Sequence, residues 1–329
     1  MPRVVVFDEA GPPEVLRIVD EPVGEPAAGE VRVKIKAIGV NRLDQIVRSG
    51  TVPQPIGPTA LPHARLGCEG TGTIDALGPG VEGFSVGDPV IITAVPRMDV
   101  NGTYAEYTVV PAGTVIHRPA ELNATHAAAM WVAYSTAYGA LVEKAAVRPG
   151  DHVLITAASS SVGLAAIQVA NQIGAVPVAV TRRTSKKAGL LAAGAAAAIA
   201  TDQEDVNEVV RRYTDGAGAD IILDFVMGPG LPELAKAAKR GGILLTAGWL
   251  EPQPAPIPMT WPLTIIGYAG FEHTTDSTVV RRIVAFLTAG LRTGALQPHV
   301  SKVFDLDDIV AAHHYLEQGE RFGKIVVTV

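Results

Sequence analysis

The chain has 329 residues, with 33 acidic and 27 basic side chains and a formal net charge of −6. This length favours about two domains, with a core that needs no disulfide or structural metal. The negative charge, without a long basic block, argues against a nucleic-acid-binding protein. The single cysteine, Cys68, excludes both an intramolecular disulfide and a four-cysteine zinc site.

Hydrophobic residues make up 48% of the chain, but no run of about 18 apolar residues is free of charges and helix breakers. We therefore expect no membrane span. The N-terminal apolar stretch, Val4 to Phe7, ends at Asp8 and predicts a strand instead of a secretion signal. These features favour a cytoplasmic protein.

Short strand patterns occupy the first third of the chain. They cover residues 31–40, 70–78, 88–95 and 105–111, and clusters of Gly, Pro and Asp separate them. Such spacing predicts an irregular β-rich domain. We expect this domain to span residues 1–124.

Helices and strands alternate from residue 125 onward. The predicted strands begin at Val153, Val178, Ala196, Ile221 and Ile243. The alternation predicts right-handed βαβ crossovers, and hence an α/β fold with a doubly wound parallel sheet and helices on both faces. We place this domain at residues 125–264.

The last part of the chain follows a Pro-rich stretch at 251–262, which predicts a linker or a docking loop. Beyond it we expect a helix at 279–291, a strand at 301–306, a helix at 307–319 and a strand at 324–329. The last strands are placed most simply on the β-rich domain. Residues 265–329 are therefore expected to return to it and complete it.

The segment HVLITAASSSVGLAAIQ, residues 152–168, is typical of a strand, a turn of small residues and a helix. In a dinucleotide-binding turn, small residues let backbone amides approach a pyrophosphate, and the helix N-terminus favours the negative charge. Only one of the three GxGxxG glycines remains. The candidate pyrophosphate-binding residues are Ala158, Ser160, Ser161, Val162 and Gly163, with the two serines as hydroxyl donors. The motif alone is equally consistent with a βα unit that simply packs tightly and binds no dinucleotide.

The residues that end the second strand of this domain indicate whether it binds NAD or NADP. In NAD-specific folds an acidic residue ends this strand and binds the adenosine ribose, whereas here the strand ends at Thr181 and continues RRTSKK. Basic and hydroxyl side chains are suited to a 2′-phosphate. The candidates are Thr181, Arg182, Arg183, Ser185 and Lys186. A solvated helix start is the alternative, but cations in a first helical turn oppose the helix dipole, so we expect NADPH.

A third candidate position follows the strand that begins at Ile243. There the backbone from Ala247 through Gly248 to Trp249 is expected to meet the nicotinamide ring. An ordinary strand-to-loop turn explains the glycine equally well.

Six segments together carry a resemblance to a known family. They are NRLD (41–44), GCEGTGTIDALGPGVEGFSVGDPV (67–90), GTYAEYTVVPA (102–112), STAYGALVE (135–143), AASSSVG (157–163) and GKIVV (323–327). In this order they resemble the medium-chain dehydrogenase/reductase superfamily. More narrowly, the chain is similar to the zinc-independent quinone oxidoreductases, the zeta-crystallin-like proteins.

The resemblance implies a GroES-like catalytic domain formed by both chain ends, a central Rossmann domain and an active site in the cleft between them. It also implies a homodimer, commonly built by edge pairing of the nucleotide-domain sheets. Catalytic and cofactor-contacting roles are implied for Asn41, whose amide would orient a carbonyl, and for Thr136, which would line the nicotinamide pocket. Lys324 would approach the cofactor.

Each of these roles has a simpler alternative. Asn41 is also a standard helix-capping residue, as is Asp44, and for Asp44 we favour capping. A threonine in a buried helix often bonds to its own backbone, which is the alternative for Thr136. A lysine at a strand end is usually solvated, which is the alternative for Lys324.

We expect no metal. The resemblance puts Asn41 where zinc-bearing relatives have a cysteine and Cys68 where they have a histidine. Glu69 remains, and a site of Cys68, Glu69 and His63 stays open as the less favoured alternative. The favoured one is a buried Cys68 and a loop His63.

Without a metal, hydride transfer suits conjugated acceptors, because the charge spreads onto a distant oxygen. We therefore expect an NADPH-dependent oxidoreductase that acts on a small hydrophobic quinone or α,β-unsaturated carbonyl. Two alternatives remain: a dedicated biosynthetic enoyl reductase, and a cofactor-binding protein without turnover.

Overall fold

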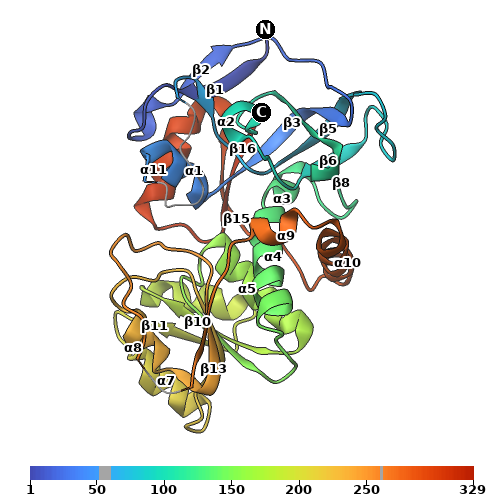
Figure 1. Ribbon diagram of the computed structural model, residues 1–329. Coiled ribbons are helices and arrows are strands. Elements are labelled where there is room, and N and C mark those ends of the chain that lie inside the picture. Colours follow the sequence, from blue (N-terminus) through green and yellow to red (C-terminus); the bar gives the residue numbers. More distant parts are fainter. Residues whose placement is uncertain (52–60, 260–261) are drawn as a thin grey trace. The chain divides into compact units, whose positions relative to one another are not determined.

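A computed structural model of the chain describes residues 1–51, 61–259 and 262–329. Residues 260 and 261, in the Pro-rich stretch, lie outside this description. The chain divides into two compact units, which Figure 1 shows: unit 1, residues 1–131 and 298–329, and unit 2, residues 132–297. Within the described ranges, no helix has the length and apolar character needed to cross a membrane.

Unit 1 is built on a seven-stranded sheet in the order β15-β16-β3-β5-β6-β8, with β7 also paired to β3. Its strands are β3 (Glu30–Val40), β5 (Gly70–Leu77), β6 (Pro89–Ile92), β7 (Tyr107–Pro111), β8 (Val115–His117), β15 (Val300–Asp305) and β16 (Lys324–Thr328). Alternate residues of β3, Val31, Val33 and Ile35, are buried, as the period of a strand requires. Since β16 pairs with β3, the last strands return to the β-rich domain, as the sequence indicates.

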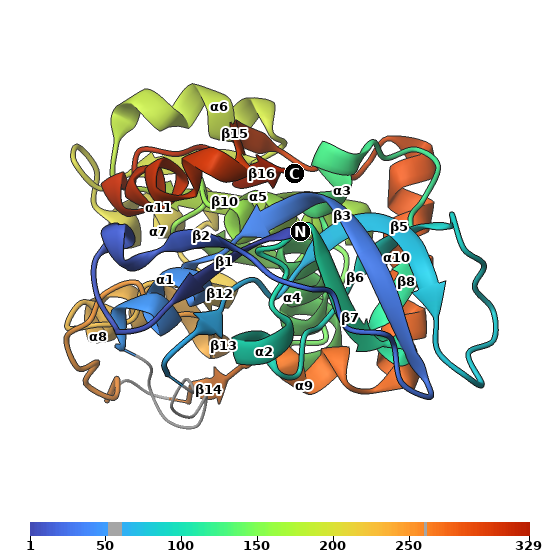
Figure 2. The ribbon, with the colours of Figure 1, turned by 90° about the horizontal axis from the view of Figure 1, so that it is seen from above.

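A second, three-stranded sheet in unit 1 joins β1 (Arg3–Phe7), β2 (Arg17–Asp20) and β4 (Ala64–Arg65). Figure 2 shows β1 and β2 side by side. The helices of this unit are α1 (Arg42–Ser49), α2 (Met98–Asn101), α3 (Ala124–Ala128) and α11 (Ile309–Gln318), with 3-10 turns at Pro13–Val15, Ala112–Thr114 and Leu306–Asp308. Helices α1 and α11 lie against each other, joined by Arg48 and His313.

Unit 2 contains a six-stranded parallel sheet in the order β11-β10-β9-β12-β13-β14. Its strands are β9 (His152–Ile155), β10 (Val176–Thr181), β11 (Ala197–Ala200), β12 (Ala219–Asp224), β13 (Ala238–Thr246) and β14 (Thr264–Gly267). This is the order of the doubly wound dinucleotide-binding sheets, in which the direction of winding reverses between the first and fourth strands. The predicted parallel sheet is confirmed.

Helices cover both faces of this sheet (Figure 1). The helices of unit 2 are α4 (Trp131–Tyr138), which begins at the unit boundary, α5 (Ser161–Ile173), α6 (Lys187–Ala192), α7 (Val206–Tyr213), α8 (Leu231–Ala235), α9 (Phe271–Thr274) and α10 (Ser277–Thr293), with a 3-10 turn at Thr184–Lys186 and a π-helical turn at Gly139–Lys144. The central strands β9 and β12 are almost continuously apolar and buried, because neither face meets solvent.

The unit boundaries differ from those expected at 124/125 and 264/265. Strand β14 pairs with β13 and completes the parallel sheet, so unit 2 extends beyond 264 and the return to unit 1 begins at Pro298. At the other boundary, α3 remains with unit 1. Its Ala128 carbonyl lies directly against Gly39 of β3, where no side chain would fit.

Candidate functional site

The turn between β9 and α5 has the geometry of a helix N-terminus that is open to a ligand. Ser160 is the N-cap of α5, and its Oγ accepts the Gly163 amide at 3.1 Å. The amide of Ala158 donates to the Val180 carbonyl at 3.0 Å and ties the turn to β10. The amides of Ser161 and Val162 belong to the first helical turn, where the helix itself supplies no acceptor. These two N–H groups can therefore bind an anion.

Gly163 is required by the close approach of the helix to the turn. A Cβ at this position would lie 2.6 Å from Ala158 Cα and 2.7 Å from the Ala157 carbonyl oxygen. Both are backbone atoms, so neither can move aside like a flexible side chain. This is the packing role of the third glycine in dinucleotide-binding turns, and it explains why this position of the motif is a glycine.

The buried Asp224 joins the ends of β9 and β12, where the strand order reverses. Its Oδ1 accepts the Thr156 hydroxyl at 2.7 Å, and its Oδ2 accepts the Met227 amide at 2.7 Å. Ligands of open α/β sheets bind outside the strand ends at such a reversal. Sequence analysis missed Asp224, although a carboxylate directly after the apolar run of β12 is a recognisable signal.

The basic segment after β10 lies partly beside the turn. Lys186 Nζ donates to Ser159 Oγ at 3.4 Å, so the structure brings this lysine to the β9–α5 turn. Thr181 is buried, whereas Arg182, Arg183 and Ser185 are exposed. These side chains are accessible to an anion that lies across the turn.

A carboxylate missed by sequence analysis orders this basic segment. Asp202, which follows β11, accepts the Thr184 amide at 3.1 Å and the Thr184 hydroxyl at 2.8 Å. These hydrogen bonds hold the pKa of Asp202 below its usual range. The Thr184 hydroxyl is thus committed to Asp202.

The segment after β13 runs beside the segment after β12. The Ala247 amide donates to the Asp224 carbonyl at 2.8 Å, and a Cβ at Gly248 would lie 3.1 Å from the Phe225 carbonyl oxygen. Trp249 is 40% exposed. Ala247 and Gly248 therefore stand at the same sheet end as Thr156 and Asp224.

Thr136 lies half-buried on α4 against the loop that follows β14. Its Oγ1 is 3.1 Å from the position of a Cβ on Gly270. One turn later, Gly139 begins the π-helical turn, and its missing side chain leaves room for Tyr268 and His273, whose side chains share a hydrogen bond of 3.0 Å. A π-helical turn often marks a functional segment.

In unit 1, Asn41, Glu69 and Lys324 form one buried cluster. Lys324 and Glu69 are each 1% exposed and form an ion pair. Lys324 Nζ also donates to Asn41 Oδ1 at 2.6 Å, and Asn41 Nδ2 donates to Glu69 Oε1 at 3.0 Å and to the Gly39 carbonyl at 3.0 Å. A solvated Lys324 is therefore wrong, because its ammonium is held inside the unit. The orientation of the Asn41 amide is fixed by a cation on its oxygen and an anion on its nitrogen.

Asp44 orders the start of α1, the role that capping predicts for it. Its carboxylate accepts the Asn41 amide at 2.7 Å and the Gly67 amide at 3.2 Å. Burial raises the pKa of Asp44 to about 6, although these hydrogen bonds and the charge of Lys324 act in the opposite direction. The carboxylate thus connects α1 with the loop that carries Cys68 and Glu69.

The candidate ligands that the structure describes do not fit a zinc ion. The alternative site of His63, Cys68 and Glu69 is not formed, because His63 pairs with Glu21 and Glu69 already has the Lys324 ammonium. Burial raises the pKa of the Cys68 thiol well above its usual range, as expected for the small buried residue of the favoured alternative. Among the residues that the structure describes, no three His, Cys, Asp or Glu side chains are arranged to hold a metal.

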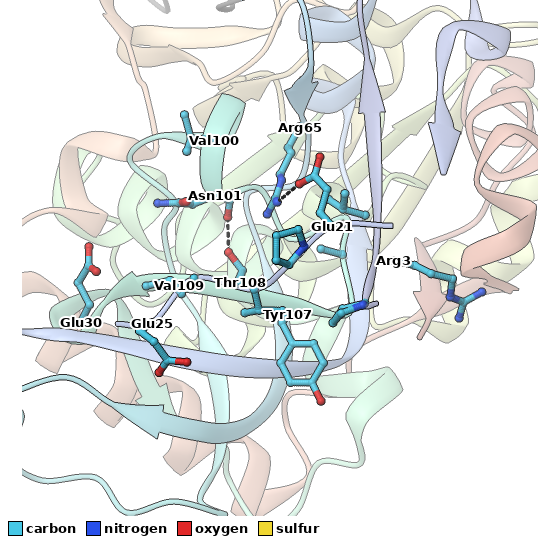
Figure 3. Close-up of a pocket in the computed structure, with 16 residues that line it drawn as sticks. Arg3, Glu21, Glu25, Glu30, Arg65, Val100, Asn101, Tyr107, Thr108 and Val109 are labelled. Carbon is cyan, nitrogen blue, oxygen red and sulfur yellow. Dashed lines mark hydrogen bonds and ion pairs between the residues drawn. The ribbon is translucent and has the colours of Figure 1, made fainter. Parts of the chain in front are cut away.

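A separate cavity of about 240 Å³ lies in unit 1 beside β1 and β7. Figure 3 shows Glu21 paired with Arg65, at 2.7 Å, and the Thr108 hydroxyl donating to the Asn101 carbonyl, at 2.6 Å. Of its other charged lining residues, Arg3 pairs with Glu106 and Asp307, and Glu25 pairs with Arg32. No candidate residue of the sequence analysis is among those that line it.

Comparisons with known proteins agree with this architecture. An alcohol dehydrogenase GroES-like domain model matches residues 27–120, and a zinc-binding dehydrogenase model matches residues 193–327. A quinone oxidoreductase from Lama guanicoe is 31% identical, over 99% of this chain and 97% of its own.

Two solved structures are similar over nearly their full length. An NAD-dependent alcohol dehydrogenase is 34% identical, with a TM-score of 0.88 and 99% of each chain covered. The quinone oxidoreductase of Escherichia coli, complexed with NADPH, is 25% identical, with a TM-score of 0.91 and coverage of 99% of this chain and 100% of its own. Sequence and structure comparisons thus agree over the whole chain: it belongs to the quinone oxidoreductase-like branch of the medium-chain dehydrogenase/reductase superfamily.

Proposed function

We propose that the protein is an NADPH-dependent reductase of quinones or other conjugated carbonyl compounds. The observation that carries the proposal is the β9–α5 turn, where an open helix N-terminus, Gly163 and the ammonium of Lys186 come together. Similarity to quinone oxidoreductases supports the acceptor class. When bound, the cofactor supplies the hydride.

The cofactor-binding residues follow from this turn outward. The amides of Ser161 and Val162 bind the pyrophosphate, and Ala158, Ser160 and Gly163 let it approach. Arg182 and Arg183 bind a 2′-phosphate by charge-assisted hydrogen bonds, with Thr181, Ser185 and Lys186 beside them. Ala247, Gly248 and Trp249 meet the nicotinamide end.

The residues proposed to act on the acceptor are Asn41 and Thr136. Lys324 holds the carbonyl oxygen of Asn41, and Glu69 Oε1 and the Gly39 carbonyl accept its two N–H hydrogens, so Asn41 orients an acceptor carbonyl by exchanging one of these partners for it. Lys324 thereby supports the site without a metal. Thr136 offers a half-buried hydroxyl from α4.

A homodimer is proposed through β14. This strand lies at an edge of the sheet, so one row of its backbone groups is available for pairing. Its Ile265 is 43% exposed, and Phe271, shortly after it, is 49% exposed. A second copy of the chain, paired edge to edge, would cover both. Native mass spectrometry tests this, and a monomer at micromolar concentration would contradict it.

The function is tested by titrating NADPH and NADH against protein fluorescence and then following NADPH oxidation with a quinone, an enone and an enoyl thioester. We expect NADPH binding and turnover of the quinone or the enone. Turnover of the thioester alone would favour a biosynthetic enoyl reductase. Binding without turnover of any acceptor would favour a cofactor-binding protein, and absence of NADPH binding would refute the proposal.

Removing the two arginines is expected to change the cofactor preference. In the double variant Arg182→Ala, Arg183→Ala the Kd for NADPH should rise by about 10- to 100-fold, because charge-assisted hydrogen bonds to the 2′-phosphate are lost. The Kd for NADH should stay unchanged. Arg212→Ala, which removes an exposed arginine of α7, is the matched control. Equal weakening for both cofactors would contradict 2′-phosphate recognition.

The two serines of the turn are expected to respond differently. Ser160→Ala removes the N-cap of α5 and should lower the free energy of unfolding by about 1 kcal/mol. Ser161→Ala leaves the cap intact and should weaken NADPH binding by the loss of a hydroxyl donor. Denaturant unfolding and NADPH titration of both variants separate the two effects. Unchanged affinity in Ser161→Ala would reduce Ser161 to a small spacer.

A further inference from the structure

A chain of buried side chains leads from α11 to the start of α1. Arg48 NH1 lies 3.0 Å from His313 Nδ1, His313 Nε2 lies 3.1 Å from the Tyr104 hydroxyl, and that hydroxyl lies 3.2 Å from Asp44 Oδ2. All four residues are at most 1% exposed. His313 lies in the helix that the sequence predicts at residues 307–319, on a face of α11 that is buried in unit 1.

Chemistry fixes the direction of every hydrogen bond in this chain. A guanidinium only donates, so His313 Nδ1 accepts from Arg48. The neutral imidazole then carries its hydrogen on Nε2 and donates it to Tyr104. The Tyr104 hydrogen is left for Asp44, which accepts it as a carboxylate.

The fixed direction argues against proton conduction. A proton passed along the chain to Asp44 would have to be replaced from Arg48, which does not deprotonate in proteins. Burial and the neighbouring charge of Arg48 lower the pKa of His313 to about 3, so the imidazole stays neutral near pH 7. The chain therefore holds Asp44 in place and does not relay protons.

We propose that His313 and Tyr104 are positioning residues. Through Asp44 they fix the backbone amides of Asn41 and Gly67. Asp44 Oδ2 accepts both the Tyr104 hydroxyl and the backbone amide of Asn41, and Asp44 Oδ1 accepts the backbone amide of Gly67. Asn41 belongs at the same time to the Lys324 and Glu69 cluster. Helix α11 thus helps to set the site from outside it. The expected effect on turnover rests on the proposed function, whereas the expected effect on structure does not depend on it.

The first test is hydrogen exchange, which does not depend on activity. Tyr104→Phe deletes only the hydroxyl and should speed exchange of the Asn41 and Gly67 amides by about tenfold, the factor for loss of a hydrogen bond to an ionised group. His313→Leu should have the same effect. His313→Gln supplies both an acceptor and a donor and should restore slow exchange. Tyr107→Phe, a hydroxyl deletion nearby in β7, is the control and should exchange like wild type.

The second test separates positioning from general instability. Tyr104→Phe and His313→Leu should lower kcat for the quinone or enone by a larger factor than they raise the Kd for NADPH, because most of the proposed cofactor contacts lie in unit 2. His313→Gln should recover kcat. Wild-type exchange at Asn41 and Gly67 in both disruptive variants would overturn the proposal. An inactive wild-type protein would instead refute the proposed function and leave the exchange experiment to decide.

Discussion

Lys324→Met is expected to destabilise unit 1 by about 3–5 kcal/mol, because it removes one partner of a buried ion pair and leaves the other charge uncompensated. Methionine fills a similar volume, so the loss of charge dominates. Glu69 is 1% exposed and cannot recover its hydration without opening the structure. Thermal unfolding followed by circular dichroism should show a melting temperature lower by about 10 °C.

The double variant Lys324→Met, Glu69→Gln separates charge from packing. It removes the uncompensated carboxylate, so it should regain much of the lost stability, and the two changes should be strongly non-additive. If Lys324→Met melted at the wild-type temperature, the buried ion pair would not be a stabilising part of the cluster.

Gly163→Ala is expected to lower NADPH affinity by at least about tenfold and to destabilise unit 2 by about 1–3 kcal/mol, the usual effect of overpacking. The new methyl group would lie 2.6 Å from Ala158 Cα. The helix therefore has to move away from the turn, and the first-turn amides of α5 move with it. Isothermal titration with NADPH and denaturant unfolding measure the two effects.

Gly230→Ala is the matched control for this change. Gly230 lies in the same unit, and nothing lies within 4 Å of the position of its Cβ. Its substitution should leave NADPH affinity unchanged. Full NADPH affinity in Gly163→Ala would mean that this turn does not bind the pyrophosphate.

Patterns local in sequence predicted the parallel sheet well. The strands starting near Val153 and Ile221 are short apolar runs between helical segments, and this pattern depends only on neighbouring residues. The same pattern did not predict strand β14. Thr264–Gly267 has only four residues after a Pro-rich stretch, and its membership of the sheet depends on β13 as a partner.

The buried polar groups were the least predictable part. Lys324 follows a glycine at the start of a strand, which indicates a solvated end, yet its partner Glu69 lies 255 residues earlier in the chain. His313 contacts Arg48 across a separation of 265 residues. No pattern of spacing encodes such pairs. Asn41 and Asp44 could be predicted as ordered polar residues, because a helix starts within the same few residues.

The pairing of β16 with β3 has a consequence for biosynthesis. Unit 2 is one continuous stretch of chain and can fold as soon as it has left the ribosome. Unit 1 cannot, since β3 is made early and its neighbour at residues 324–328 emerges only after the whole of unit 2. Until then the exposed edge of β3 is free to pair with other chains, so the nascent protein needs protection from aggregation.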